Sequence, residues 1–350
     1  MQVVNPLVES TWNRWIEKYE DASFFHTSEW ASVLSESYGF SPKYFVFHKS
    51  GDAKAFIPIM EVRSLLTGKR GVSLPFTDYC PPLLEDSIEW NNIWEILLNY
   101  GTKSGWKYLE LRGGNLKWFQ PEDRTIYFEH KLALDADISK MKASIRESTR
   151  RNIKKAENSG IQINRDDSVE GLGVFQQMNC ITRQEHGLPP QPLRFFRSLY
   201  RNVISKGNGS IFIAKAPVGN SKSRIQQGIA AMVFVRFGRK VIYKYGASVK
   251  EGKYTNASNL LMWKAIEYFA SEGCVELNLG RTDMENSGLR QFKRSWGTSE
   301  NELYYWKYNF QKGEMVKDPP KVYGIHNVLF SNMPRPFLKL AGTIFYRHMG

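Results

Sequence analysis

Hydrophobic residues recur along the 350-residue chain with a helical period in some stretches and form short apolar or alternating runs in others. The first half contains two helical stretches, then three strand-like runs, then one more helix and one more strand. The expected helices cover residues 7–20, 27–37 and 87–104, and the expected strands cover 44–49, 55–62, 71–76 and 106–113. The pattern predicts one α+β unit in this half.

The second half repeats this order of helices and strands. The expected helices lie near 169–184, 192–206 and 257–271, and the expected strands cover 210–215, 228–237, 240–248 and 274–280. The strongest local match pairs "SGWKYLELRGG" at 104–114 with "SEGCVELNLGR" at 271–281, because each places a helix-ending Gly before alternating apolar positions. We therefore predict an internal duplication, with a ligand-binding cleft between the two copies.

The fold class expected from this duplication is α+β (mixed α/β), with two tandem domains that each contain a twisted mixed sheet flanked by helices. We place the first domain at 1–134, the second at 135–310 and a C-terminal helical tail at 311–350. The tail mixes Phe, Leu and Ile with Arg335, Lys339 and Arg347. We expect it to pack on the body of the protein, and contact with a membrane surface is the alternative.

Between the two halves, residues 135–160 are expected to form one long helix that ends at Gly160. One side of this helix is apolar, and the other is cationic, with Arg146, Arg150, Arg151, Lys154 and Lys155. Like charges at positions i, i+4 and i+8 repel one another. An anionic ligand would explain why the chain tolerates this repulsion, and a solvated helix face is the alternative.

The composition agrees with a folded protein that binds anions. Hydrophobic residues make up 42% of the chain and charged residues 24%, and the formal net charge is +13. The charge favours a nucleic acid, a nucleotide, a phospho-sugar or an anionic membrane as partner. The three cysteines are far apart in sequence, so we expect neither disulfides nor a metal site. The cysteines fit a reducing, cytoplasmic location. No signal peptide or membrane span is expected, so the protein should be soluble, with peripheral contact at the inner face of the membrane as the alternative, and we expect a monomer.

The most informative segment runs from "LNLGRTD" at 277–283 to "GLRQFKRSWG" at 288–297. Apolar residues at helical spacing explain part of it as core, but they do not explain Asp283 and Lys293 beside a strand end. Strand ends hold reacting groups rigidly. We therefore predict a site in which cations, including Arg281, hold a negatively charged donor while an amine attacks its carbonyl, and in which Asp283 accepts the amine proton.

Four further residues are weaker candidates for substrate binding. Asp78 and Tyr79 lie in the proline-rich segment 73–84, where Asp78 is suited to hold an amine and Tyr79 to stack; a stiff surface loop is the alternative. Tyr245 lies on one face of a predicted strand, where a half-buried Tyr is also ordinary. His186 is a second candidate base, or simply a loop residue. The P-loop, zinc-peptidase and α/β-hydrolase motifs are absent.

With these motifs together, the chain resembles the Fem family of non-ribosomal peptidyltransferases, a branch of the Gcn5-related N-acyltransferase (GNAT) superfamily. The resemblance extends over most of the chain. It is carried by "RRNIKKAENSGI" at 150–161, "HGLPPQPLRFF" at 186–196, "YKYGAS" at 243–248, "NLLMWKAIEYFASEG" at 259–273, and the segments at 277–283 and 288–297, and more loosely by "FTDYCPPLL" at 76–84.

The resemblance implies two tandem GNAT-like domains and the formation of an amide. The implied donor is an aminoacyl-tRNA, a co-substrate rather than a cofactor, and the implied acceptor is an amine of a cell-wall or envelope precursor. The family's Phe-Lys pair falls on Phe292 and Lys293, so Lys293 would steady the donor's terminal nucleotide or the developing oxyanion. The long coiled-coil arm of several family members is missing.

Two alternatives to this function remain. Typical single-domain relatives bind acyl-CoA through a pattern like [QR]-x-x-G-x-[GA] between a strand and a helix, and the stretch 245–261 lacks it. An acyl-CoA-dependent N-acyltransferase acting on an amino sugar or a lipid-linked amine in polysaccharide biosynthesis is the first alternative. The second is a binder of RNA or anionic lipid that has lost catalysis and uses only the 146–155 face. Catalysis predicts that Asp283 and Lys293 line the same cleft.

Overall fold

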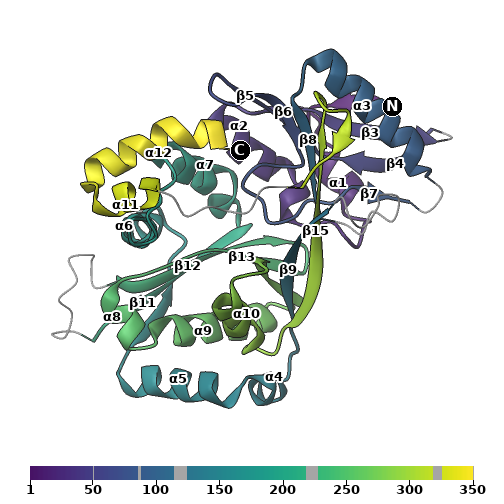
Figure 1. Cartoon of the computed structure of the whole chain (residues 1–350). Helices are drawn as coiled ribbons and strands as arrows, with labels where there is room; N and C mark the ends of the chain where they lie inside the picture. The colour runs from purple at the N-terminus through teal and green to yellow at the C-terminus, as the bar shows by residue number, and fades with distance from the viewer. Residues whose placement is uncertain (50, 86–87, 114–123, 218–227, 318–324, 350) are drawn as a thin grey trace. The chain divides into compact units, whose positions relative to one another are not determined.

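The computed structural model describes residues 1–49, 51–85, 88–113, 124–217, 228–317 and 325–349 (Figure 1). The start of the helix expected over 87–104 and residues 318–324 and 350 of the expected tail lie outside these ranges.

The chain forms two compact units, and each is assembled from separate segments. Unit 1 comprises Met1–Phe128, Glu302–Lys321 and Ile344–Gly350, and unit 2 comprises Glu129–Asn301 and Val322–Thr343. The chain therefore passes from one unit to the other inside the strands β9 (Arg124–Ala133) and β15 (Ser299–Asn309), and again inside the C-terminal helix α12.

Unit 1 contains short strands and three α-helices in the described residues. They are β1 (Gln2–Val4), α1 (Trp12–Ile16), α2 (Ser28–Tyr38), β2 (Ser41–Pro42), β3 (Tyr44–Lys49), β4 (Asp52–Ile57), β5 (Met60–Ser64), β6 (Gly68–Val72), β7 (Leu83–Leu84), α3 (Trp90–Ser104), β8 (Tyr108–Arg112) and β16 (Glu314–Met315). One sheet has the strand order β1-β3-β4-β7, and a second runs β8-β6-β5-β2, with β15 beside β8. The buried side of α3 packs into an aromatic core that includes Trp106 and Trp306.

The single strand expected over 55–62 is wrong, because this run forms β4 and β5 in two different sheets. Pro58 lies between them, and a proline cannot donate a hydrogen bond to a strand ladder. An uninterrupted strand is therefore disfavoured at this position.

Unit 2 contains the longer elements. They are α4 (Ile138–Ser144), α5 (Glu147–Asn158), β10 (Gln162–Arg165), α6 (Val169–Glu185), α7 (Leu193–Asn202), β11 (Gly209–Lys215), β12 (Gly228–Phe237), β13 (Lys240–Ser248), α8 (Lys250–Tyr254), α9 (Ala257–Ser271), β14 (Glu276–Asp283), α10 (Ser287–Arg294) and α11 (Ile325–Asn332). The sheet order is β10-β11-β12-β13-β14-β9. Helix α6 covers one face, α9 covers the other, and α5 packs on α9 (Figure 1). The mixed α/β class predicted from the sequence is confirmed.

The single long helix expected over 135–160 is wrong, because it is two helices, α4 and α5, separated at Ile145 and Arg146. Both of these residues have extended ψ angles, 137° and 139°. The Arg146 N–H donates to the Ser295 carbonyl oxygen at 2.9 Å, so it is not available for a continuing helix. The predicted amphipathicity is correct: Met141, Ile153 and Ala156 are buried, and the cations lie on the other side.

The described part of the C-terminal tail forms α11 and α12 (Arg335–Met349). Within unit 2, Asn327 Nδ2 donates to the Gly187 carbonyl oxygen at 3.3 Å, and Gln184 Nε2 donates to the Met333 carbonyl oxygen at 2.8 Å. Within unit 1, the end of α12 contributes the buried Tyr346, which stacks on Tyr38. In the described ranges, no helix combines the length and the apolar character that crossing a bilayer requires.

Candidate functional site

The parallel strands β13 and β14 pair over a short stretch and then separate. The paired residues run from Lys240 with Glu276 to Ile242 with Asn278. Beyond these pairs, β13 continues to Ser248 and β14 continues to Asp283. The backbone groups of β14 in this region cannot be satisfied by β13, so they need partners from elsewhere.

Side chains supply those partners at the end of β14. The fully buried Asn278 accepts a hydrogen bond from the Gly280 N–H at 2.7 Å and donates to Glu129 Oε1 at 2.7 Å. Lys293 Nζ donates to the carbonyl oxygens of Gly280 at 2.9 Å and of Arg281 at 3.0 Å. Gly280 has a φ of +75°, a conformation that favours glycine. The lysine is 4% exposed, so its charge lies in a region of low dielectric at the strand end.

A second polar group lies near Lys293. His130, which is buried, has its Nε2 atom 2.9 Å from Glu300 Oε2, and Arg290 contacts both carboxylate oxygens of Glu300, at 3.1 and 2.7 Å. The hydrogen bonds from Arg290, together with those from His130, lower the pKa of Glu300 to about 2. Burial lowers the pKa of His130, and the nearby Lys293 charge lowers it further. Neutral His130 and ionised Glu300 are therefore the forms expected at pH 7.

Acid should destabilise the protein through this pair. Both residues have lower pKa values in the folded state than their ordinary values of 6.5 and 4.5, so the folded state binds fewer protons. The stabilisation from His130 is lost as the pH falls below about 6.5, and that from Glu300 as the pH falls from about 4.5 towards 2. Because Glu300 is partly solvated, we expect the free energy of unfolding to fall by about 1–2 kcal/mol when this carboxylate is protonated. Urea unfolding at several pH values should show a shallower acid dependence for Glu300→Gln, and an unchanged dependence would contradict this assignment.

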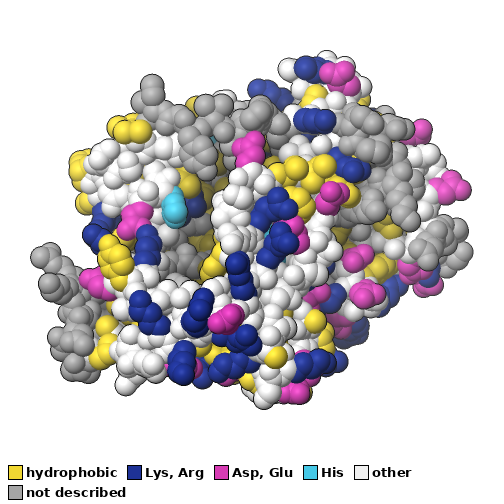
Figure 2. Space-filling model, turned by 60° about the horizontal axis from the view of Figure 1, so that its bottom comes forward, with side chains coloured by type: hydrophobic (Ala, Val, Ile, Leu, Met, Phe, Trp, Pro, Cys, Tyr) yellow, Lys and Arg dark blue, Asp and Glu magenta, His cyan; other side chains and the backbone are white. Residues whose placement is uncertain are grey.

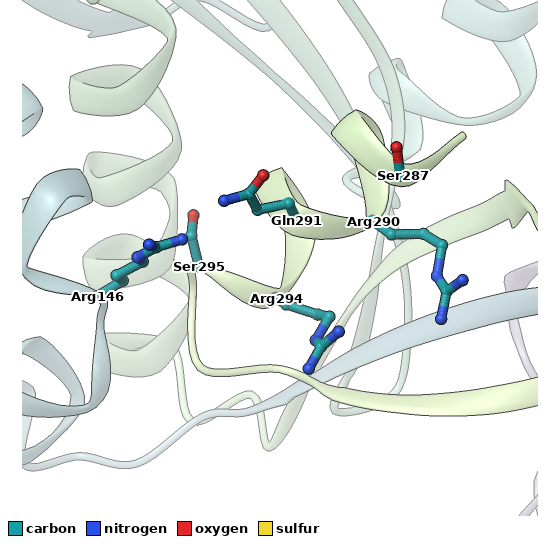
Figure 3. Close-up of a pocket in the computed structure, with 6 residues that line it drawn as sticks. All are labelled: Arg146, Ser287, Arg290, Gln291, Arg294 and Ser295. Carbon is teal, nitrogen blue, oxygen red and sulfur yellow. The ribbon is translucent and has the colours of Figure 1, made fainter. Parts of the chain in front are cut away.

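Helix α10, which carries Lys293, also lines an arginine pocket of about 550 Å³ with a face that does not include this lysine (Figure 3). Its lining residues are Arg146, Ser287, Arg290, Gln291, Arg294 and Ser295. Five of the six come from α10 and its C-terminal cap, at spacings of three and four residues that place them on one face. Arg146 precedes α5 and points toward Ser295, and Thr149 Oγ1 donates to Ser295 Oγ at 2.9 Å. These contacts fix the start of α5 against the end of α10.

This arginine pocket carries uncompensated positive charge. Glu300 neutralises Arg290, but the exposed Arg146 and Arg294 have no side-chain hydrogen bond or ion pair within the described ranges. None of the lining residues is acidic. Figure 2, which brings the side of α5 and α10 forward, shows Lys and Arg side chains gathered there. A pocket with two arginine forks and hydroxyl and amide donors is suited to bind phosphate or another anion.

Five of the residues predicted from the sequence lie on or beside the separating strands. Tyr245 and Arg281 each lie three residues beyond the last pair of their own strands, β13 and β14. The Tyr245 ring is 5.9 Å from that of Phe195. Asp283, which is half-buried, ends β14, so it follows the segment whose carbonyl groups Lys293 holds. Phe292, also half-buried, packs edge-on against Trp296 at 6.3 Å.

The other predicted residues lie elsewhere. Arg150, Arg151 and Lys154 are on the outer side of α5; Arg151 forms a 3.5 Å ion pair with Glu147 and Lys154 is exposed. His186 is exposed at the C-terminal end of α6.

Asp78 and Tyr79 belong to unit 1. The Tyr79 ring is buried against Phe25, and the Asp78 carbonyl oxygen accepts a hydrogen bond from the Tyr305 hydroxyl at 2.6 Å.

Several site residues were not predicted from the sequence. His130 and Glu300 are 170 positions apart, and no local pattern links them. Arg294 and Ser287 were detectable, because the polar positions of α10 recur at helical spacing and define a second face beside the apolar one.

Comparison with known proteins agrees with this description. Residues 143–294 match the family described as "Acetyltransferase (GNAT) domain". The crystal structure of FemX has a TM-score of 0.65 at 13% identity, over 87% of this chain and 96% of that chain. L-PGS from Bacillus licheniformis has a TM-score of 0.55 at 13% identity, over 95% and 98%. A tandem GNAT protein from the clavulanic acid biosynthesis pathway has a TM-score of 0.50 at 10% identity, over 77% of this chain and 83% of that chain. No curated protein matches the chain.

The matched domain includes the separating strands, the buried Lys293 and all of the arginine pocket except Ser295. Residues 143–294 therefore form a GNAT-type acyltransferase domain. More particularly, the fold over most of the chain is the tandem-domain GNAT fold, similar to that of FemX. The family resemblance seen in the sequence and the predicted GNAT-like fold are thereby confirmed.

Proposed function

We propose that this acyltransferase moves an aminoacyl group from aminoacyl-tRNA to an amine of a cell-wall or envelope precursor. The observation that carries the proposal is the arginine pocket, whose charge no acidic lining residue offsets and which adjoins the cationic side of α5. The fold is similar to that of FemX, and the resemblance of the sequence to the Fem family implies aminoacyl transfer. The donor is a co-substrate, so the reaction needs no resident cofactor.

The cations are arranged along a line that suits an RNA backbone. Arg150 and Lys154 are spaced by four residues on α5, which places them about 6 Å apart along the helix axis, and Arg146 lies at the N-terminal cap of this helix. Arg146 and Arg294 of the arginine pocket would bind phosphates near one end of this row. Arginine forks bind phosphate oxygens in pairs, and such contacts supply most of the sequence-independent affinity for nucleic acid.

The proposed chemistry takes place at the end of β14. The acceptor amine attacks the ester carbonyl carbon of the donor, a C–N bond forms, and the C–O bond to the tRNA ribose breaks. Asp283 accepts the proton that the amine loses, and the ribose oxygen takes up a proton as it leaves. Lys293 supplies positive charge for the oxyanion, or holds the terminal nucleotide, from a buried position where charge acts strongly. Phe292, Arg281 and Tyr245 would contact the donor or the acceptor.

The connection between β13 and α9 supports aminoacyl-tRNA over acyl-CoA. The short helix α8 occupies this connection, and its Gly252 packs so closely on Ile229 that a Cβ atom would lie 2.1 Å from the Ile229 carbonyl oxygen. A compact glycine-rich phosphate loop of the acyl-CoA type is not formed by this sequence. An acyl-CoA-dependent reaction on an amino sugar or lipid-linked amine is the alternative that the experiment must separate.

Replacing Arg146 and Arg294 together with alanine should weaken tRNA binding at low salt by about tenfold or more. Each lost phosphate contact should also reduce the salt slope of log K by about 0.7–0.9. The measurement is a calorimetric titration with deacylated tRNA, and with CoA in parallel, at two salt concentrations. Arg14→Ala with Arg197→Ala is the matched control, since both residues are exposed and outside the site.

Titration with tRNA and with CoA separates the aminoacyl-tRNA reaction from the acyl-CoA reaction. Strong tRNA binding that falls in the Arg146/Arg294 variant, but not in the control, would support the proposal. Binding of CoA alone would favour the acyl-CoA reaction, and equal tRNA binding by both double variants would contradict the role of the arginine pocket.

A further inference from the structure

Helix α12 presents an apolar stripe to solvent. Phe337, Leu340 and Ile344 are spaced by three and four residues, so they lie on one face of the helix. Their exposed fractions are 63%, 55% and 49%. The buried residues Leu338 and Tyr346 of α12 lie on a different face, which packs on the protein. The apolar stripe therefore does not contribute to the core.

A turn at the end of this helix is also apolar. The β5–β6 connection, which we call the leucine turn, contains Leu65 and Leu66, with exposed fractions of 100% and 67%. Ser64 Oγ accepts hydrogen bonds from the N–H groups of Leu66 and Thr67, at 3.1 and 2.9 Å. The turn is thus held in a shape that presents both leucines to solvent.

His348 links the leucine turn to the last turn of α12. Its Nδ1 atom is 3.0 Å from Ser64 Oγ, and its carbonyl oxygen accepts hydrogen bonds from Arg70 Nη2 at 3.0 Å and Thr67 Oγ1 at 3.3 Å. These residues all belong to unit 1, as does Ile344. The leucine turn therefore lies beside the end of α12.

The charges around these apolar residues are positive. Arg335, Lys339 and Arg347 are exposed on α12, and neither α11 nor α12 contains an acidic residue. An exposed apolar stripe flanked by cations is typical of a helix that lies at the surface of an anionic bilayer. A second copy of the chain fits less well, because its own cations would face these with no acidic partner on either helix.

We propose that the apolar stripe and the leucine turn dock on the surface of an anionic lipid bilayer. The apolar side chains would enter the boundary between headgroups and acyl chains, while the cations pair with lipid phosphates. This inference does not depend on which acyl donor the enzyme uses. It would bring the enzyme to a membrane surface, where an acceptor attached to lipid is accessible.

Sedimentation of the full chain with vesicles tests the proposal. We expect binding to vesicles that contain phosphatidylglycerol and much weaker binding to phosphatidylcholine alone. Replacing Phe337, Leu340 and Ile344 with serine, or Leu65 and Leu66 with serine, should each lower partitioning by about tenfold or more. Val8→Ser with Val169→Ser is the matched control, because both valines are exposed, at 81% and 56%.

A charge variant keeps the test informative if the serine variants fold poorly. Lys339→Glu with Arg347→Glu leaves every apolar residue in place and should reduce binding to anionic vesicles by at least about tenfold. Three results would overturn the proposal: no binding to anionic vesicles at low salt, equal binding by the variants and the wild type, or sedimentation velocity showing that the stripe instead mediates a dimer that the serine variants dissociate.

Discussion

Replacing Lys293 with methionine should lower the rate of acyl transfer at least about a hundredfold. A positive group that stabilises a developing oxyanion from a buried position contributes at this scale. Methionine keeps the apolar stem of the side chain and removes the charge. Because the proposed effect is on the transition state, kcat should fall far more than the affinity for the acceptor.

The same substitution should also reduce stability, because Lys293 holds two carbonyl groups at the end of β14. Losing a charged donor to two buried acceptors should lower the free energy of unfolding by about 2–4 kcal/mol. Rates must therefore be measured at a temperature where both proteins are fully folded, with Lys264→Met as control. Lys264 is a solvated lysine on α9. An unchanged rate per folded molecule would limit Lys293 to holding the strand.

Replacing Asp283 with asparagine should reduce turnover by about 10²–10⁴, the usual contribution of a general base. The substitution preserves size, and Asp283 is only half-buried, so the free energy of unfolding should change by less than about 0.5 kcal/mol.

Glu285→Gln is the control for Asp283→Asn, because it removes a carboxylate that lies just beyond β14 and is exposed. It should leave the rate unchanged. Equal rates in the Asp283→Asn and Glu285→Gln variants would exclude Asp283 as the base and would favour a route in which the substrate itself accepts the proton.

The elements predicted best from the sequence are those with the strongest periodicity. Strands β12 and β13 and helix α9 have the bounds expected for them, since each is a long, largely apolar run bordered by polar or glycine residues. Strand β14 extends beyond its expected end, so Arg281 and Asp283 are part of the strand rather than of the segment after it. A strand continued by side-chain hydrogen bonds leaves no signal in the hydrophobic pattern.

The features that were missed depend on contacts between distant parts of the chain. The break at Ile145 reflects a hydrogen bond to Ser295, which the helical periodicity of 135–160 does not reveal. The arginine pocket also combines Arg146 with residues of α10, far along the sequence. Single residues of this site, such as Lys293, were predictable because their neighbours form a family motif, whereas their partners were not.

Unit 1 is built from segments that are synthesised at different times, and this affects how it folds in the cell. Met1–Phe128 leaves the ribosome first, but Trp306, a member of the unit 1 core, and the residues of β15 that pair with β8 follow only after the whole of Glu129–Asn301. Until then, the apolar surface that Trp306 covers stays open to water. We therefore expect the nascent N-terminal segment to depend on chaperones, while the continuous part of unit 2 can collapse as it emerges.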